Sequence, residues 1–168
     1  MASVTPLQAS GPGISPYNPL VVSLALLAAG AAIATVFLYR EAMDRHRTGE
    51  RGSFAWLFGL IGVIGLLISG EIFWANWAGF QAAQYTELFG VAQTLYAAVM
   101  IAAAFVIYTD LDPRPFTWFT AIAGLVLLQG ARAILTFQLT RSPPVSAGIW
   151  GTAGLAGVVL LPAAYLEE

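Results

Sequence analysis

Residues 54–75 read FAWLFGLIGVIGLLISGEIFWA, an apolar run with a single charge, Glu71, close to its end. The hydrocarbon core of a bilayer is about 30 Å thick, and a helix of roughly 20 mostly apolar residues is needed to cross it. This run therefore predicts a transmembrane helix. Four further apolar stretches of similar length flank it, at 20–39, 88–109, 116–137 and 147–166. The sequence predicts an all-α integral membrane protein, folded as a bundle of five transmembrane helices.

The last stretch, 147–166, allows a second interpretation. It is rich in glycine, and Pro162 lies near its end. Proline removes a backbone donor and interrupts a helix. A segment that enters the membrane and turns back is tolerated where protein covers it. The alternative fold is four spans followed by a re-entrant segment.

The composition excludes several classes of protein. Hydrophobic residues make up 58% of the chain, charged residues make up 10%, and the mean hydropathy is +0.76, which is not the balance of a soluble domain. The chain has no cysteine, and its one histidine, His46, lies in a charged loop. A net charge of −2 provides no cationic surface for nucleic acid. We expect no resident metal or cofactor and no nucleic-acid partner.

The segment 1–19 precedes the first span. It contains prolines and glycines but no arginine or lysine, so it lacks the basic region that begins a signal peptide. We expect it to be a retained extramembrane tail.

The distribution of arginine predicts the orientation of the bundle. The loops 40–53 and 110–115 fall on one side of the membrane, and they contain Arg40, Arg45, Arg47, Arg51 and Arg114. The opposite side has only Arg141. Because loops rich in basic residues stay in the cytoplasm, we expect a multi-pass protein of the cell membrane with its N-terminus outside and its C-terminus in the cytoplasm.

Small residues recur at regular spacing in two of the spans. Glycine occupies every third position at Gly59, Gly62 and Gly65, and again at Gly148, Gly151, Gly154 and Gly157. Helices in lipid associate through close packing, which favours small residues at their contacts. These glycines are predicted to form helix contacts within the chain, and the alternative is a site of self-association between copies of it.

Two ionisable residues lie within the predicted spans. A charge at the centre of a membrane helix costs about 2.5–3.5 kcal/mol on insertion scales and usually finds a partner. A rise of 1.5 Å per residue places Glu71 and Arg132 near the same outer level, so an ion pair between them is geometrically possible. Gln93, Tyr96 and Gln129 lie at neighbouring depths.

This polar cluster has two interpretations. In the first, Glu71, Gln93, Tyr96, Gln129 and Arg132 line a small cavity that opens outward and holds a polar head group, an anion or a proton. In the second, a single ion pair fixes the register of the helices.

Two short motifs resemble a known family. They are Tyr85-Thr86-Glu87-Leu88-Phe89-Gly90, followed by an alanine-rich span, and Thr140-Arg141-Ser142-Pro143 before a glycine-rich last span. They resemble a domain-of-unknown-function family of small prokaryotic polytopic membrane proteins, over roughly residues 20 to 166. The resemblance implies a compact membrane bundle with Glu87 and Gly90 as structural positions, and it brings no catalytic residues.

Catalytic motifs are missing from the sequence. It contains no HExxH, no glycine-rich phosphate loop and no pair of histidines for haem within the spans. We therefore expect a protein that is not an enzyme.

Two functions remain. The first is an accessory subunit of a larger membrane complex, for example a respiratory or other energy-transducing assembly, with membrane lipids and other membrane subunits as partners. The alternative is a small permease, channel, or protein binding a lipid or quinone head group, which would use the Glu71 and Arg132 cavity.

Overall fold

The computed structural model describes residues 19–45, 47–74, 83–140 and 142–166. These residues form five helices, α1 (Pro19–Ala42), α2 (Glu50–Trp74), α3 (Ala83–Thr109), α4 (Arg114–Phe137) and α5 (Pro143–Ala163). All five are long and apolar enough to cross a membrane. The predicted all-α bundle of five helices of membrane-spanning length is thus confirmed. Of the predicted tail 1–19, only Pro19 lies within the described residues, as the first residue of α1.

The helix ends follow the turn residues of the sequence. Asp110 after α3 and Gln138 after α4 adopt left-handed conformations, with φ of 54° and 53°. The backbone N–H of Gln138 donates a hydrogen bond to the Ile134 carbonyl, as in the usual left-handed C-terminal cap. Pro143 begins α5, where a missing N–H costs nothing.

α5 is one continuous helix of 21 residues. Pro162 is next to its last residue, so proline removes a hydrogen bond only from the final turn. A re-entrant segment would have to turn back, and α5 does not. The structure therefore supports five spans over the four-span alternative.

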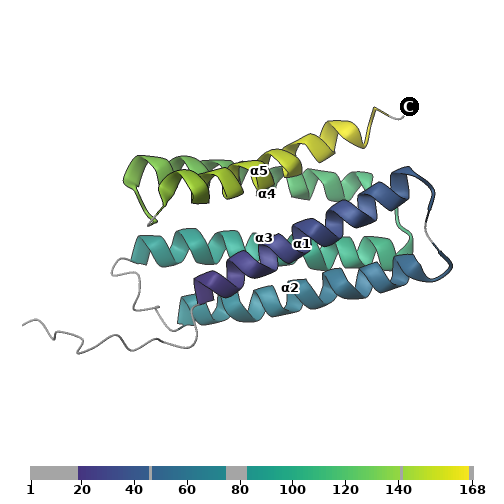
Figure 1. The fold of residues 1–168 in the computed structure, drawn as a ribbon, viewed down its shortest axis with the longest axis horizontal. Helices are drawn as coiled ribbons and strands as arrows, with labels where there is room; N and C mark the ends of the chain where they lie inside the picture. Colours follow the sequence, from purple (N-terminus) through teal and green to yellow (C-terminus); the bar gives the residue numbers. More distant parts are fainter. Residues whose placement is uncertain (1–18, 46, 75–82, 141, 167–168) are drawn as a thin grey trace, which may run out of the picture.

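Figure 1 shows how the helices are arranged. α2 packs along α3, and α4 packs along α5, so that two antiparallel helix pairs lie side by side and meet where α3 contacts α4. α1 lies obliquely across α2 and touches α3. At one end of the bundle α1, α3 and α5 begin, and we call this the N-terminal end. The other, with the 40–53 and 110–115 loops, is the arginine-rich end.

Glycines and a hydroxyl network join α2 to α3. A Cβ at Gly62 would lie 2.8 Å from the Ala97 carbonyl oxygen, so only glycine allows the two backbones to approach this closely. Further along α2, the buried Ser69 hydroxyl lies 2.5 Å from the Thr94 hydroxyl and donates to the Gly90 carbonyl at 3.1 Å. Interhelical hydrogen bonds and close packing are the main forces between helices in lipid.

The α4–α5 pair repeats this construction. A Cβ at Gly154 would lie 2.7 Å from the Gly124 carbonyl oxygen, and one at Gly157 would lie 2.6 Å from the Thr120 carbonyl oxygen. The predicted contact role is confirmed for these glycines and for Gly62. It is wrong for Gly148 and Gly151, where a Cβ would meet nothing within 4 Å. A spacing of three drifts around a helix of 3.6 residues per turn, so successive glycines cannot all face the same neighbour.

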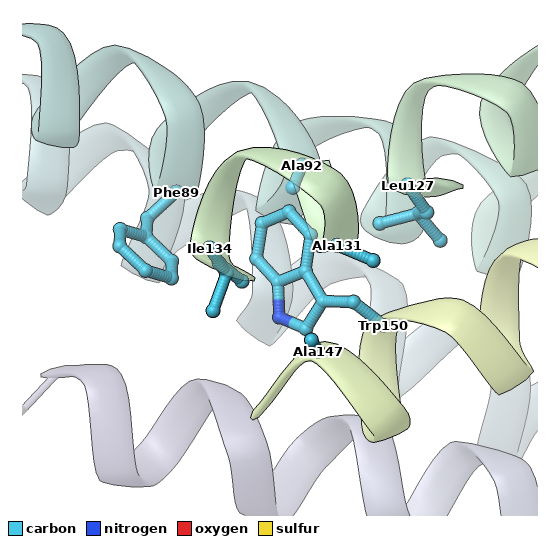
Figure 2. Packing of buried hydrophobic residues seen from close by; sticks show 7 residues of the cluster. All are labelled: Phe89, Ala92, Leu127, Ala131, Ile134, Ala147 and Trp150. Atoms are coloured by element: carbon cyan, nitrogen blue, oxygen red, sulfur yellow. The ribbon is translucent and has the colours of Figure 1, made fainter. Parts of the chain in front are cut away.

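A cluster of buried side chains joins the two helix pairs near the N-terminal end (Figure 2). Trp150 projects from α5 and packs edge-to-face on Phe89 of α3, with ring centroids 5.4 Å apart. Gly130 on α4 leaves the space that the indole occupies. The complete cluster is Phe89, Ala92, Leu127, Ala131, Ile134, Ala147 and Trp150. A second cluster, centred on Phe37, Phe54 and Phe58, packs α1 on α2 toward the arginine-rich end.

Candidate functional site

An apolar groove runs between α1 and the α4–α5 pair, with α3 as its floor. α1 approaches α2 and α3 but, within the described residues, makes no close backbone approach to α4 or α5. The groove has a volume of about 180 Å³. Its lining includes Leu27 and Ala31 from α1, Val99 and Met100 from α3, Ala123 and Leu127 from α4, and Ala156 and Leu160 from α5. We call it the α1–α5 groove.

A smaller cavity adjoins the groove toward the N-terminal end. It has a volume of about 30 Å³, and it shares Leu27, Tyr96 and Leu127 with the groove. Its polar lining residues besides Tyr96 are Ser23 from α1 and Gln93 from α3. We call it the polar end of the groove.

Ser23 and Gln93 are buried at this polar end. The Ser23 side chain is 9% exposed and Gln93 is 6% exposed. Neither the Ser23 Oγ nor the Gln93 Nε2 has a hydrogen-bond partner among the described residues. The great majority of buried side-chain polar atoms in proteins are hydrogen-bonded, so two unpartnered groups on residues that line one cavity make it a candidate place for a ligand group or water to bind.

Tyr96 lies between the polar end and the groove. Its hydroxyl crosses from α3 to α1 and donates a hydrogen bond of 2.9 Å to the Leu26 carbonyl. Gly30 makes this crossing possible, because a Cβ at that position would overlap the Tyr96 hydroxyl. The bond fixes the distance between α1 and α3, and with it the width of the groove.

The residues predicted as a polar cluster separate into two groups. Gln93 and Tyr96 lie together at the polar end of the groove. Glu71, Gln129 and Arg132 are exposed. Glu71 is on α2 and Arg132 is on α4, and these helices are not neighbours. The cavity that the structure contains is therefore lined by Gln93 and Tyr96, without Glu71, Gln129 or Arg132.

The groove and its polar end are also lined by residues that were not predicted from the sequence. Ser23 is one of the few polar residues in the first span. Its depth along that helix could have indicated that it lies at the level of the polar cluster. Thr120 lines the groove near its other end, where its hydroxyl donates to the Thr117 carbonyl at 2.8 Å. No sequence pattern indicated that α1 would stand apart from α4 and α5, because α1 is apolar on all sides.

Charged side chains connect the helices at the arginine-rich end. Arg51 at the start of α2 forms ion pairs with Asp110 after α3, at 2.9 Å, and with Glu41 near the end of α1, at 3.3 Å. Arg40 pairs with Glu50. Since these groups are at least partly exposed, each pair contributes little to stability. Their common effect is to tie the ends of three helices together. His46, in the same loop, lies outside the described residues.

The groove and its polar end contain groups that can bind a ligand. The polar end offers a hydroxyl and a carboxamide, which donate and accept hydrogen bonds without changing charge. Among the residues that the structure describes, no group of three or more His, Asp or Glu side chains could hold a metal ion. Together, the fold and the groove define a five-helix bundle of membrane-spanning length with an apolar groove that ends in neutral polar groups.

The chain belongs to the family described as "Protein of unknown function (DUF981)", whose model matches residues 16–168. This confirms the resemblance to a domain-of-unknown-function family. Gly90, one of the positions that the resemblance emphasised, packs directly under the ring of Phe73. Comparison with curated proteins and with solved structures finds no match.

Proposed function

We propose that this protein is a non-catalytic integral membrane protein that binds a lipophilic small molecule in the α1–α5 groove. The observation that carries the proposal is the groove itself. Helices in lipid associate by close packing, as α2–α3 and α4–α5 do here through Gly62 and Gly154. By contrast, α1 does not pack closely on the α4–α5 pair, and a groove of about 180 Å³ lies between them.

The dimensions of the groove favour a chain or ring as its occupant. From Trp150 at the polar end to Leu160 in the groove, α5 rises about 15 Å, so the two cavities together span about half of a 30 Å hydrocarbon core. A helix about 10 Å across would require more than about 1,000 Å³ over that length. A single acyl or prenyl chain from one leaflet fits this space better than a partner helix.

The orientation predicted from the arginines would place the site in the outer leaflet. The N-terminal end of the bundle, where Ser23 and Gln93 lie, is the end opposite Arg51 and Arg114. A ligand would then enter sideways from the outer half of the bilayer, with its polar part at Ser23 and Gln93.

Two neighbouring alanines on α1 provide the test. Ala31 lines the groove, Ala32 is not among its lining residues, and both are exposed. A lipid extract from the native membrane is expected to raise the melting temperature of the wild type and of Ala32→Phe, because a ligand stabilises the folded state that binds it. Ala31→Phe, which fills the groove, is expected to lose this stabilisation. Equal stabilisation of both variants would overturn the proposal.

The accessory-subunit function is a second candidate, and one observation favours it. Gly148 on α5 is exposed, and neither it nor Gly151 has an atom within 4 Å of the position of a Cβ. Glycine in a helix costs about 1 kcal/mol relative to alanine, and none of the residues that the structure describes fills the space that these two glycines leave. A helix of another membrane subunit could pack there.

Co-purification tests the second candidate. Mild extraction of the native membrane followed by native gels and mass spectrometry is expected to find the chain at fixed stoichiometry with other subunits. Gly148→Leu is expected to release it from them, and Leu155→Ile, a change on the exposed surface of α5, is the matched control. A chain that migrates alone in the wild type would exclude this function.

A further inference from the structure

We infer that Ser23 and Gln93 together recognise a carbonyl oxygen, so that the ligand of the α1–α5 groove is a lipophilic carbonyl compound. This inference rests on the proposed function and names the chemical class of its ligand. Two sources provide this chemistry in a membrane: the ester of an acyl lipid and the ring of a prenyl quinone.

First, the Ser23 hydroxyl and the Gln93 amide nitrogen are buried and have no hydrogen-bond partner among the described residues. Both residues are more than nine-tenths buried. The amide nitrogen carries two N–H donors, and the hydroxyl carries one O–H donor. Ser23 on α1 and Gln93 on α3 both line the polar end, so a small rotation of their side chains would let both donate to a single acceptor oxygen placed between them.

The second step is the size of the polar end. Its volume of about 30 Å³ exceeds the roughly 10–15 Å³ that one water-sized group requires, but only by a small factor. One oxygen atom and its carbon fit there.

The third step is charge. No arginine, and no other charged residue, is among the residues that line the polar end or the groove. An anionic head group buried there would have no countercharge, and burying an unpaired charge is far more costly than burying a neutral acceptor. A neutral carbonyl is therefore favoured over a phosphate or a carboxylate.

The fourth step is the position of Tyr96. Its hydroxyl already donates to the Leu26 carbonyl, so it does not need to donate to a ligand. Tyr96 lines both the polar end and the groove. A ligand that passes Tyr96 would place its carbonyl beside Ser23 and Gln93 and its apolar chain along Leu27, Val99 and Ala156.

Matched pairs of probes test the inference. A diester phospholipid and its diether analogue differ in the carbonyl groups alone, and a prenyl quinone and its quinol differ in whether the ring oxygens are carbonyls or hydroxyls. Each probe is titrated into the purified full chain in mild detergent, and binding is measured by native mass spectrometry. We expect one carbonyl probe to bind about three- to tenfold more tightly than its partner, which is the range for one neutral hydrogen bond. The pair that shows this difference identifies the source.

Variants of the polar end complete the test. Gln93→Leu is expected to abolish the preference for the carbonyl probe. Ser23→Ala is expected to reduce the same preference, and it removes only one oxygen atom, so it serves if Gln93→Leu does not fold. Melting curves without any probe establish that each variant is folded.

The outcomes separate the inference from the function on which it rests. If ester and ether, and quinone and quinol, bind the wild type equally and Ala31→Phe abolishes all binding, the groove is a binding site and the carbonyl inference is wrong. If no probe binds the wild type and no molecule co-purifies with it, the proposed function itself fails. A carbonyl preference that persists in both polar-end variants would also overturn the inference.

Discussion

The Tyr96 hydroxyl on α3 donates a hydrogen bond of 2.9 Å to the backbone carbonyl of Leu26 on α1. It reaches that carbonyl across Gly30, where any side chain would block it. α1 packs mainly on α2, and this bond attaches it to α3. This bond therefore adds to the α1–α2 packing in positioning α1, which is one wall of the α1–α5 groove.

Tyr96→Phe is expected to loosen α1. The loss should be about 0.6 kcal/mol of unfolding free energy and at most about 1.7 kcal/mol, the range measured for side-chain hydrogen bonds between membrane helices. Unfolding in mixed micelles measures it. Tyr108→Phe is the control, because Tyr108 is 69% exposed and its ring lies on the surface. Identical curves for the two variants would show that the bond does not hold α1.

Alanine substitutions at two glycines of α5, three residues apart, are expected to have different effects on the free energy of unfolding. At Gly154 a Cβ would lie 2.7 Å from the Gly124 carbonyl oxygen, so Gly154→Ala forces α4 and α5 apart and should cost about 1–3 kcal/mol. At Gly151 a Cβ meets nothing within 4 Å, so Gly151→Ala should be neutral or stabilise the helix by up to about 1 kcal/mol. Thermal unfolding of the two variants makes the comparison, and a destabilised Gly151→Ala would contradict it.

Ser69→Ala is expected to weaken the α2–α3 pair. The variant removes the donor to the Gly90 carbonyl and the bond to Thr94, and it should cost about 0.6–1.7 kcal/mol. Thr35→Val is the matched control, because the Thr35 hydroxyl bonds to the Ala31 carbonyl of its own helix. We expect the control to unfold like the wild type, so similar losses in both would refute an interhelical role for Ser69.

Gln93→Leu is expected to stabilise the chain in the absence of ligand. The Gln93 amide nitrogen is buried without a partner among the described residues, which costs about 1–3 kcal/mol, and leucine of similar volume removes that cost. A purely structural glutamine predicts the reverse sign. Unfolding after delipidation, with Gln93→Met as a second apolar replacement, measures the effect, and a loss of stability in both variants would assign Gln93 a structural role.

The orientation can be tested cleanly because the chain has no cysteine. Ser142 and Thr48 are both exposed, at the N-terminal and arginine-rich ends respectively. A membrane-impermeant thiol reagent is expected to label Ser142→Cys in intact cells and Thr48→Cys only after permeabilisation. The opposite pattern would invert the orientation predicted from the arginines.

Much of the fold could be predicted from the sequence because the bilayer restricts what can cross it. Stretches such as 54–75 and 88–109 have few alternatives to a helix in lipid, and Pro143 and Asp110 mark helix ends by their own conformational preferences. The cost of glycine in a helix predicted the α5 contact at Gly154, although the same prediction was wrong for Gly148 and Gly151.

The site was harder to predict because depth along a helix does not determine direction around it. Glu71 and Arg132 share a level, but α2 and α4 are separated in the bundle, so equal depth does not make them neighbours. Gln93 and Tyr96 are one turn apart on α3 and face the same side, which the spacing of three allowed. The groove depends on which helices pair, and the interhelical contacts that decide this are not local in sequence.

The most direct test of groove binding is native mass spectrometry of the chain released gently from its own membrane, beside Ala31→Phe and Ala32→Phe. We expect a bound lipophilic molecule at one per chain in the wild type and in Ala32→Phe, and none in Ala31→Phe. A wild-type chain that carries no such molecule, or an Ala31→Phe variant that carries it as fully as the wild type, would show that the groove is not a binding site.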